Sequence, residues 1–481
     1  MEKEELNYER YMKDMVERGR IAQAIARHYD QERVDELCEA VSFAAVNEEF
    51  RREAAQMLLD ESHMGNFEDK FNKIRNKAMG VYRDMKGEKS VGIIETDTEK
   101  NLVTYIKPMG VVGAILPVTN GEATPIVKSL WALKSRNAII FSPGRAGKKT
   151  AMYVVDYIRR VLKKFDAPED LVQCIEPDFV GRESAGFMMK MCDFVVATGG
   201  SGLVRSAYSS GTPAIGVGAG NATTYIDTTA DLEDAARKIR ISQTFDYSTS
   251  CSSENNAVVD ENVYEAFLNA CKDEGAVIIH NGSPEKERLL KTLWPEWPEN
   301  HKISRNVAAR SISVILKAAE IEAPEHVSFA VVEEADGLGE GYPFTGEKLC
   351  PVLTVVKAKD FEDGLDKIEE ILNYSGNGHS CGIHTKDDKK VDKMAERMNV
   401  ARILVNQPQA LGNAGAYFNG LPITMSLGCA TWGGNSTCRN VTWRDITNTT
   451  TVSRPVEEII PTEETLYSER IRNMTFEREG R

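Results

Sequence analysis

The chain has 481 residues, and its 59 Lys and Arg against 73 Asp and Glu give a formal net charge of −14. This acidic balance argues against a nucleic-acid binder that works through a broad basic face, so no nucleic-acid partner is expected. Apolar residues make up 42% and charged residues 27%, which is ordinary globular usage and excludes a fibrous or largely disordered chain. The length predicts two or three domains.

Membrane segments, disulfides and metal sites are not expected either. The longest apolar runs, such as residues 110–118, fall short of the ~18 to 20 residues that span a bilayer, and residues 1–5 lack the apolar core of a secretory signal. The nine cysteines are odd in number and form no C-x-x-C pair, and the seven histidines show no metal-binding spacing. We therefore predict a cytoplasmic protein without membrane contact, disulfide framework or bound metal.

The first part of the chain is predicted to be helical, and the next part is predicted to alternate between strands and helices. Apolar residues at helical spacing predict three or four amphipathic helices over residues 7–80, with a solvated face of mixed charge. From residue 91, short apolar runs alternate with helical stretches, which is typical of parallel βαβ units and a doubly wound nucleotide-binding sheet. We expect strands at 111–116, 138–141, 171–175 and 194–197, and helices at 124–133, 149–165 and 203–208.

A second series of such units runs from residue 231 to residue 427. Segments 91–106 and 446–452 alternate like exposed strands and are expected to pair with each other or with another subunit. Residues 453–481 are charged and contain proline, so we expect them to wrap the surface. The second series predicts strands at 257–259, 276–279, 351–357 and 401–405, and a helix at 361–374.

Three kinds of segment hold the residues best suited to chemistry. Cys251 lies among small polar residues that suit a tight turn presenting a thiol at a helix start, where backbone N–H groups lower its pKa. Asn120 follows a predicted strand, so its amide can donate to a developing oxyanion at the carboxyl edge of the sheet. The Gly-rich segments 198–202 and 216–221 can bring N–H groups close to a phosphate. Taken singly, each also suits an ordinary role as buried filler, helix cap or turn.

Taken together and in order, these motifs resemble the aldehyde dehydrogenase superfamily, and more narrowly its coenzyme A-acylating branch. The resemblance covers roughly residues 10–450. It is carried by Thr119-Asn120, Thr198-Gly199-Gly200-Ser201, the run 216–221, Cys251, Glu347-Lys348-Leu349-Cys350-Pro351 and Thr431-Trp432-Gly433-Gly434-Asn435-Ser436.

The resemblance implies an α/β fold in three parts and a homodimer or homotetramer. The parts are a Rossmann-like cofactor domain (1–88 and 108–221), an α/β catalytic domain (222–427) and a β bridging arm (89–107 and 428–452), followed by a C-terminal tail (453–481).

The resemblance also implies roles for individual residues. Cys251 is the expected nucleophile, and Asn120 with the backbone N–H of Cys251 forms the oxyanion hole. His379 is expected to help deprotonate the thiol of coenzyme A. Glu347 is expected to hold the nicotinamide ribose. The full set expected at the nicotinamide cofactor is Leu116, Pro117, Thr119, Ser142, Pro143, Arg145, Thr198, Gly199, Gly200, Ser201, Gly218 and Glu347.

One departure from the hydrolytic relatives predicts the acyl acceptor. Those relatives place a glutamate in the stretch that aligns with Val217-Gly218-Ala219-Gly220-Asn221, where this chain has no carboxylate. Without that general base water is not activated, so the enzyme thioester is expected to persist until coenzyme A, a better nucleophile, takes the acyl group.

The choice between NAD and NADP stays open, with a lean to NADP. Hydrolytic members carry a lysine that touches the adenosine ribose, and this chain has Ser142 at that position. Arg145 and Lys148 are cations close enough in sequence to neutralise a ribose 2′-phosphate, although both also suit ordinary surface charge at a helix start.

The residues around the thiol favour a polar or anionic aldehyde. If buried beside a methyl group, the hydroxyls of Ser250 and Ser252 would be left unpaired at a cost of ~1 to 3 kcal/mol each. Arg439 and Arg444 are candidates for meeting an anion, or else for an ion pair at a subunit interface. The pattern is similar to that of acylating sulfoacetaldehyde dehydrogenases, with acetaldehyde or another short aldehyde as the alternative substrate.

The leading expectation is thus a reversible, NAD(P)-dependent, coenzyme A-acylating aldehyde dehydrogenase. A rival enzyme would use the same thiol with water or phosphate as acceptor. A third reading is a non-catalytic scaffold or microcompartment cargo that keeps the fold, and the presence of both Asn120 and Cys251 argues against it.

Overall fold

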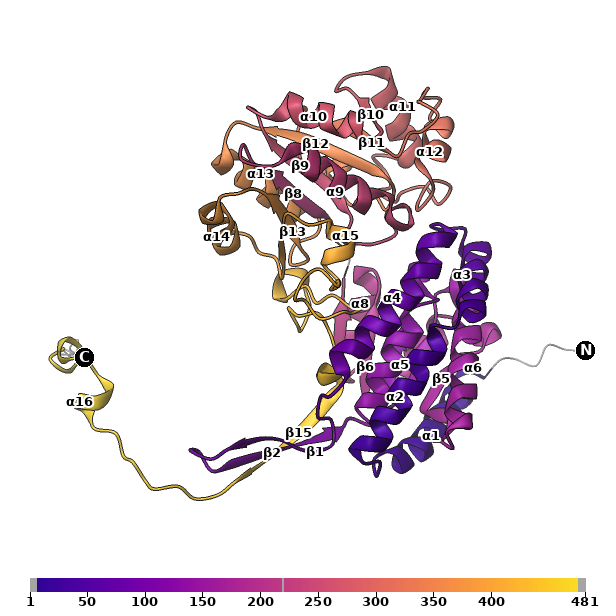
Figure 1. The fold of residues 1–481 in the computed structure, drawn as a ribbon, viewed down its shortest axis with the longest axis vertical. Helices are drawn as coiled ribbons and strands as arrows, with labels where there is room; N and C mark the ends of the chain where they lie inside the picture. Colours follow the sequence, from indigo (N-terminus) through magenta and orange to yellow (C-terminus); the bar gives the residue numbers. More distant parts are fainter. Residues whose placement is uncertain (1–6, 219, 475–481) are drawn as a thin grey trace, which may run out of the picture.

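Three sheets organise the protein, as the computed structural model shows for residues 7–218 and 220–474 (Figure 1). A five-stranded parallel sheet and a seven-stranded parallel sheet form two separate α/β bodies, and a three-stranded antiparallel sheet projects from the first as an arm. The predicted α/β class with a doubly wound sheet is confirmed. Among the described residues, no helix is both long and apolar enough to cross a bilayer.

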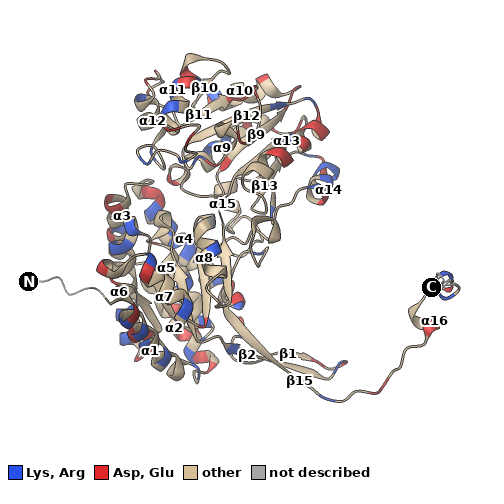
Figure 2. Cartoon of the chain, turned by 180° about the vertical axis from the view of Figure 1, so that it is seen from behind, with Lys and Arg blue, Asp and Glu red and all other residues tan. Residues whose placement is uncertain are grey.

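Four amino-terminal helices pack on the first body, as the helical spacing predicted. Figure 2 shows Lys and Arg mixed with Asp and Glu on their outer faces, which confirms a solvated face of mixed charge. The prediction is wrong for one side of the fourth helix, where Lys70 and Lys73 are buried. The helices are α1 (Tyr8–Ala26), α2 (Gln31–Ala45), α3 (Glu48–Ser62) and α4 (Phe67–Met85).

The five-stranded sheet has the order β5-β4-β3-β6-β7. Its strands are short apolar runs buried on both faces, as in sheets covered by helices on both sides. The predicted strands and helices of this half are confirmed within two residues at each end, whereas the helix at 182–191 and the strand at 214–217 were not predicted. The elements are β3 (Val111–Ile115), α5 (Thr124–Lys134), β4 (Ala138–Ser142), α6 (Lys148–Lys164), β5 (Val172–Cys174), α7 (Arg182–Met191), β6 (Phe194–Thr198), α8 (Ser201–Tyr208) and β7 (Ala214–Val217).

The seven-stranded sheet has the order β10-β11-β12-β9-β8-β13-β14. The four strands and the helix predicted here are confirmed as β9, β10, β12, β14 and α13. Its strands are β8 (Ala222–Ile226), β9 (Glu254–Asp260), β10 (Ala276–Ile279), β11 (Phe329–Glu333), β12 (Val352–Ala358), β13 (Cys381–His384) and β14 (Ile403–Val405). Its helices are α9 (Leu232–Thr244), α10 (Tyr264–Asp273), α11 (Pro284–Leu293), α12 (Ile312–Ala318), α13 (Phe361–Tyr374), α14 (Asp388–Arg397) and α15 (Gln409–Gly412).

The arm consists of β1 (Gly92–Asp97), β2 (Leu102–Pro108) and β15 (Thr447–Ser453), in the order β1-β2-β15. The two segments predicted to be exposed strands therefore pair with each other. The structure corrects the predicted extent of the arm, because residues 428–446 do not join this sheet. Val441, Trp443 and Ile446 are buried in the core of the first body, whereas Gly428, Cys429 and Gly433 lie against Asn377, Gly378 and Arg402 of the second.

The carboxyl-terminal segment does not wrap the surface as expected. Residues 453–474 are exposed throughout, including the short helices α16 (Glu463–Leu466) and α17 (Glu469–Arg472). Figure 1 shows this segment running away from both bodies. Its large apolar side chains are all at least half exposed: Val456, Ile459, Ile460, Leu466, Tyr467, Ile471 and Met474.

Candidate active site

A cavity of about 340 Å³ lies where the winding of the five-stranded sheet reverses. The chain leaves β3 towards β4 and β5 on one side and leaves β6 towards β7 on the other, so the loops after β3 and β6 diverge and open a crevice. These loops contribute Pro117, Thr119, Asn120, Thr198, Gly199 and Gly200 to the cavity wall. The second body closes the opposite side with residues that include Ser250, Cys251, Ser252 and Glu347.

Cys251 contacts His379 within this site. The Cys251 Sγ lies 3.3 Å from His379 Nε2, and His379 Nδ1 lies 2.8 Å from the hydroxyl of Ser380. Arg402 donates to the backbone carbonyl of His379 at 2.9 Å, which fixes the loop that carries the ring. The structure therefore brings together a thiol and an imidazole that lie 128 residues apart in the sequence.

The thiol and the imidazole are both held neutral. Burial, followed by the charge of Glu347, raises the pKa of Cys251 to about 12. Burial and the positive charge of Arg402 lower the pKa of His379 to about 3. The expectation of a thiol at a helix start with a lowered pKa is wrong, because Cys251 sits in a turn that leads into the strand β9. The pair suits transfer of a proton from sulfur to Nε2 at the moment the thiol attacks.

Asn120 is oriented by a buried lysine. Its Oδ1 accepts a hydrogen bond of 2.7 Å from Lys73 Nζ. Its Nδ2 group donates one N–H to Thr119 Oγ1 at 3.1 Å, so the second N–H is free to donate to a ligand. The backbone N–H of Cys251 has no acceptor among the described residues. These two donors match the predicted oxyanion hole, whose function stays a prediction.

The loop before Cys251 is held by a buried charge cluster that the sequence reading missed. Asp246, Tyr247 and Ser248 all have positive φ, between 48° and 58°, a strained conformation for residues with side chains. Asp246 stabilises it by accepting from Lys70 at 3.0 Å and from Lys73 at 2.9 Å. The sequence did contain a signal, because Lys70 and Lys73 lie three residues apart and so share one face of α4.

The residues expected at the cofactor divide into two groups. Pro117, Thr119, residues 198–200, Gly218 and Glu347 line the cavity. Burial raises the pKa of Glu347 to about 7, and its Oε1 accepts from Gly220 N at 3.4 Å. The other members of the expected set do not line the cavity. Leu116, Ser142 and Pro143 are buried at the ends of β3 and β4, and Arg145 is exposed. The side chain of Ser201 lies outside the described part of the structure.

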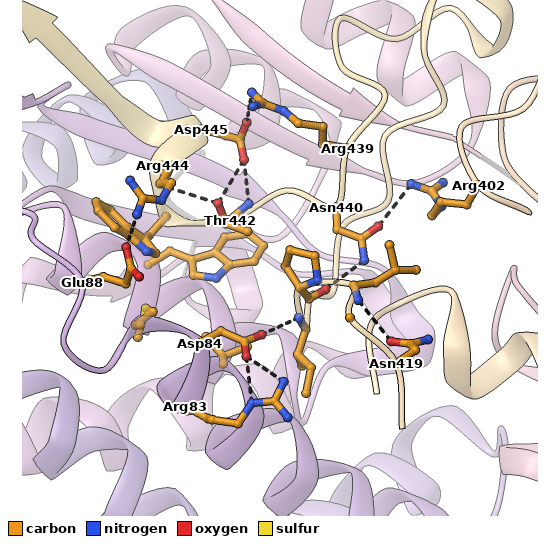
Figure 3. A pocket seen from close by; sticks show the side chains of 18 of the residues that line it. Arg83, Asp84, Glu88, Arg402, Asn419, Arg439, Asn440, Thr442, Arg444 and Asp445 are labelled. Carbon is orange, nitrogen blue, oxygen red and sulfur yellow. Dashed lines mark hydrogen bonds and ion pairs between the residues drawn. The ribbon is translucent and has the colours of Figure 1, made fainter. Parts of the chain in front are cut away.

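Arg439 and Arg444 are not placed at the thiol. Both line a different cavity of about 850 Å³, which shares no residue with the one that holds Cys251. Figure 3 shows that Arg439 pairs with Asp445, at 3.0 Å, and that Arg444 pairs with Glu88. Their charges are thus neutralised within the chain, and the structure does not support their predicted role in meeting the substrate.

The stretch where hydrolytic relatives place a glutamate is close to the thiol. A Cβ added at Gly220 would lie 2.1 Å from the carbonyl oxygen of Cys251, so this position accepts no side chain without rearrangement. Among the described lining residues, the only carboxylate is that of Glu347. No cluster of three or more metal-ligating side chains exists among the described residues.

Comparisons with known proteins agree with this arrangement. The chain matches the Aldehyde dehydrogenase family over residues 21–289 and 344–424. It is 40% identical over 460 residues to a sulfoacetaldehyde dehydrogenase of Acholeplasma sp, covering 95% of this chain and 94% of that protein. It is 41% identical over 457 residues to the acylating sulfoacetaldehyde dehydrogenase of Bilophila wadsworthia, covering 95% and 97%.

A solved structure is similar over nearly the whole chain. The crystal structure of an acetylating aldehyde dehydrogenase from Geobacillus thermoglucosidasius superposes with a TM-score of 0.90 and 33% identity, covering 96% of this chain and 100% of that one. These relatives are matched over almost their full length and are named as dehydrogenases of aldehydes, two of them as acylating or acetylating. The chain therefore belongs to the aldehyde dehydrogenase family, and its relatives include members of the acylating branch.

Proposed function

We propose that the protein oxidises a short anionic aldehyde, sulfoacetaldehyde foremost, to its coenzyme A thioester with NAD or NADP as acceptor. The observation that carries the proposal is the contact of buried His379 with Cys251, whose thiol lines a cavity together with Asn120. The two relatives at 40% and 41% identity, both named for sulfoacetaldehyde, support the substrate. Ser252, whose buried hydroxyl has no hydrogen-bond partner among the described residues, supports a polar one.

The first step forms a bond between sulfur and carbon. The sulfur of Cys251 attacks the carbonyl carbon of the aldehyde while His379 Nε2 takes the thiol proton. Negative charge develops on the carbonyl oxygen, where the Nδ2 of Asn120 and the N–H of Cys251 donate hydrogen bonds. The crevice residues would hold a nicotinamide, which would supply the hydride acceptor, and loss of the hydride from the same carbon would leave a thioester on Cys251.

The residues of the crevice fit such a dinucleotide. Residues 198–200 lead from β6 to the amino terminus of α8, where backbone N–H groups suit a phosphate. A Cβ at Gly200 would meet no atom within 4 Å, so the loop leaves room for a ligand. Glu347 lines the same cavity, where its carboxylate would accept a hydrogen bond from a ribose hydroxyl. Arg145 is exposed and Lys148 donates to the carbonyl of Pro177 at 2.8 Å, so our lean to NADP rests on Arg145.

The thioester is expected to pass to coenzyme A rather than to water. After His379 has released the first proton to solvent, it would take the proton of the coenzyme A thiol as that thiol attacks the acyl carbon, and would return it to the Cys251 sulfur as this sulfur leaves, so that the thioester bond is conserved. Hydrolysis would need a base to activate water, and residues 217, 218, 220 and 221 supply no carboxylate for it.

A spectrophotometric panel tests the reaction and the acceptor together. Without coenzyme A, we expect one burst of NAD(P)H per active site and then a steady rate lower by about 10²-fold or more, since a general base for water contributes at least that much. The panel would compare sulfoacetaldehyde, acetaldehyde, propionaldehyde and succinate semialdehyde, each with NAD and with NADP. Equal steady rates without coenzyme A would instead establish hydrolysis, and a requirement for phosphate would establish an acyl-phosphate product.

Removal of the Asn120 amide tests the oxyanion hole. Asn120→Ala is expected to lower kcat by about 10²- to 10³-fold, because one preorganised donor to the developing charge is lost. Asn120→Asp is the matched variant, since it keeps the size but replaces the donor by an acceptor, and it should be as inactive. Both would be measured by steady-state NAD(P)H formation with saturating coenzyme A. A kcat close to that of the wild type in either variant would remove Asn120 from the mechanism.

A further inference from the structure

Helix α4 brings two lysines to the wall of the cavity that holds Cys251. Lys73 and Lys77 both line this cavity, and their spacing of four residues places them one turn apart on the same face of the helix. Against these two cations the described wall contains a single carboxylate, that of Glu347. The cavity therefore has an excess of positive charge on the α4 side.

The charge of Lys73 is already neutralised by the protein. Its Nζ lies 2.9 Å from Asp246 Oδ2 and 2.8 Å from Glu122 Oε1, and it donates to Asn120 Oδ1 at 2.7 Å. Two of its N–H donors are used by Asp246 and Asn120, whereas Glu122 pairs with its charge without accepting a hydrogen bond. Two carboxylates therefore balance the charge of Lys73.

Lys77 is in a different position. Its Nζ donates to the backbone carbonyl of Ala414 at 3.1 Å, and it forms no ion pair with a carboxylate of the described residues. Burial, and then the neighbouring charge of Lys73, lower the pKa of Lys77 to about 8, with Asp84 opposing this more weakly. The side chain therefore still carries its charge at neutral pH, with two N–H donors unused and the cost of burial uncompensated.

We propose that Lys77 binds the anionic end of the substrate, with the sulfonate as the preferred group, and so selects anionic over neutral short aldehydes. The inference rests on the proposed function, because it places the aldehyde carbon at Cys251 in the same cavity. It assigns to Lys77 the role that the sequence reading gave to Arg439 and Arg444. The carbon chain would lie along the apolar residues of the wall, which include Phe245, Ala410 and Met425.

The test is the ratio of kcat/KM for sulfoacetaldehyde to kcat/KM for acetaldehyde. Lys77→Met keeps the length of the side chain but removes the charge, and it is expected to lower this ratio by about 10- to 100-fold, the loss typical of a hydrogen bond between charged groups. Lys77→Arg keeps the charge and is expected to restore most of the ratio. Arg75→Gln, which removes a charge from the exposed side of the same helix, is the control and should leave the ratio unchanged.

A second readout needs no substitution. In the wild type the ratio is expected to fall as the pH rises above about 8, because the Lys77 ammonium loses its proton. Ionisations that both substrates share, such as those of Cys251 and His379, cancel in the ratio. The groups that face Lys77 are Lys73 and Asp84 on α4 and the carbonyl of Ala414 on the loop after α15. In Lys77→Arg the fall above pH 8 should disappear, since a guanidinium stays protonated, whereas a fall near pH 7 should remain, because the ionisation of Glu347 in the same wall disfavours the anionic substrate alone.

The two proposals fail in different ways. A wild-type enzyme that prefers acetaldehyde would overturn sulfoacetaldehyde as the substrate. A wild-type preference for sulfoacetaldehyde that Lys77→Met retains, or a ratio that stays constant across pH 7 to 10, would overturn the role of Lys77 and leave the proposed function intact. If Lys77→Met lowers kcat/KM for succinate semialdehyde as much as it lowers kcat/KM for sulfoacetaldehyde, the selection by Lys77 extends from sulfonates to carboxylates.

Discussion

Cys251→Ala is expected to abolish aldehyde-dependent NAD(P)H formation, with a loss of about 10⁴-fold or more in kcat, because no other group can form the covalent acyl intermediate. The structure places no second candidate there, since Cys251 is the one cysteine among the described lining residues of the cavity. The measurement is steady-state absorbance with sulfoacetaldehyde, coenzyme A and each nicotinamide.

Binding of the nicotinamide should survive this change, because Cys251 is not among the residues expected to hold it. Titration of the intrinsic fluorescence with NAD and NADP would show that Cys251→Ala keeps the fold and the crevice. Cys438→Ala, at an exposed thiol outside the cavity, is the matched control and should keep full activity. Turnover of Cys251→Ala at the wild-type rate would refute the assignment of the nucleophile.

His379→Ala is expected to lower kcat/KM for the aldehyde by about 10²- to 10⁴-fold, the usual contribution of a positioned general base. His379 Nε2 lies 3.3 Å from the sulfur, and burial and Arg402 lower the pKa of the ring to about 3, so the imidazole is neutral and can accept the thiol proton in the tautomer that carries its hydrogen on Nδ1. This extends the predicted role of His379, which was limited to coenzyme A, to activation of Cys251 itself.

The pH profile separates this role from a merely structural one. In the wild type, neither Cys251 nor His379 ionises between about pH 6 and 9 and the proton moves internally, so kcat/KM for acetaldehyde at saturating nicotinamide should change there only modestly, through the ionisations of Glu347 and Lys77. In His379→Ala the proton must leave to solvent, so kcat/KM should rise by about tenfold per pH unit over this range. A variant with low activity and a flat profile would show that His379 acts only by packing.

Most of the fold could be predicted because its elements are encoded locally. The runs at 111–116, 138–141 and 194–197 are apolar and short, and each forms a strand buried on both faces. Residues 428–446 were wrongly assigned to the bridging arm, because their apolar residues show neither a helical nor a strand-like spacing. Their position follows from Trp443 and Val441, which insert into a core built by distant segments.

The candidate site could be predicted in its parts but not in its electrostatics. Asn120, Cys251 and Glu347 were recognised from ordered motifs, and all three line one cavity. The raised pKa of Cys251 was not foreseen, because it depends on burial and on a carboxylate that lies far away in the sequence. The sequence reading chose Arg439 and Arg444 as the cations that meet an anionic substrate. The structure does not support this choice, since these two residues are neutralised by Asp445 and Glu88.

The sequence by itself therefore determined the alternation of strands and helices and the family, and it predicted the reacting thiol, because each depends on local period or on ordered motifs. The tertiary structure alone decided that His379 meets this thiol, that Lys73 orients Asn120, and that Lys77 faces the cavity without a carboxylate partner among the described residues. The physical reason is that burial and charge pairing are properties of positions in space. Two lysines one helical turn apart look alike in a sequence, and only their neighbours from other elements separate a neutralised charge from an available one.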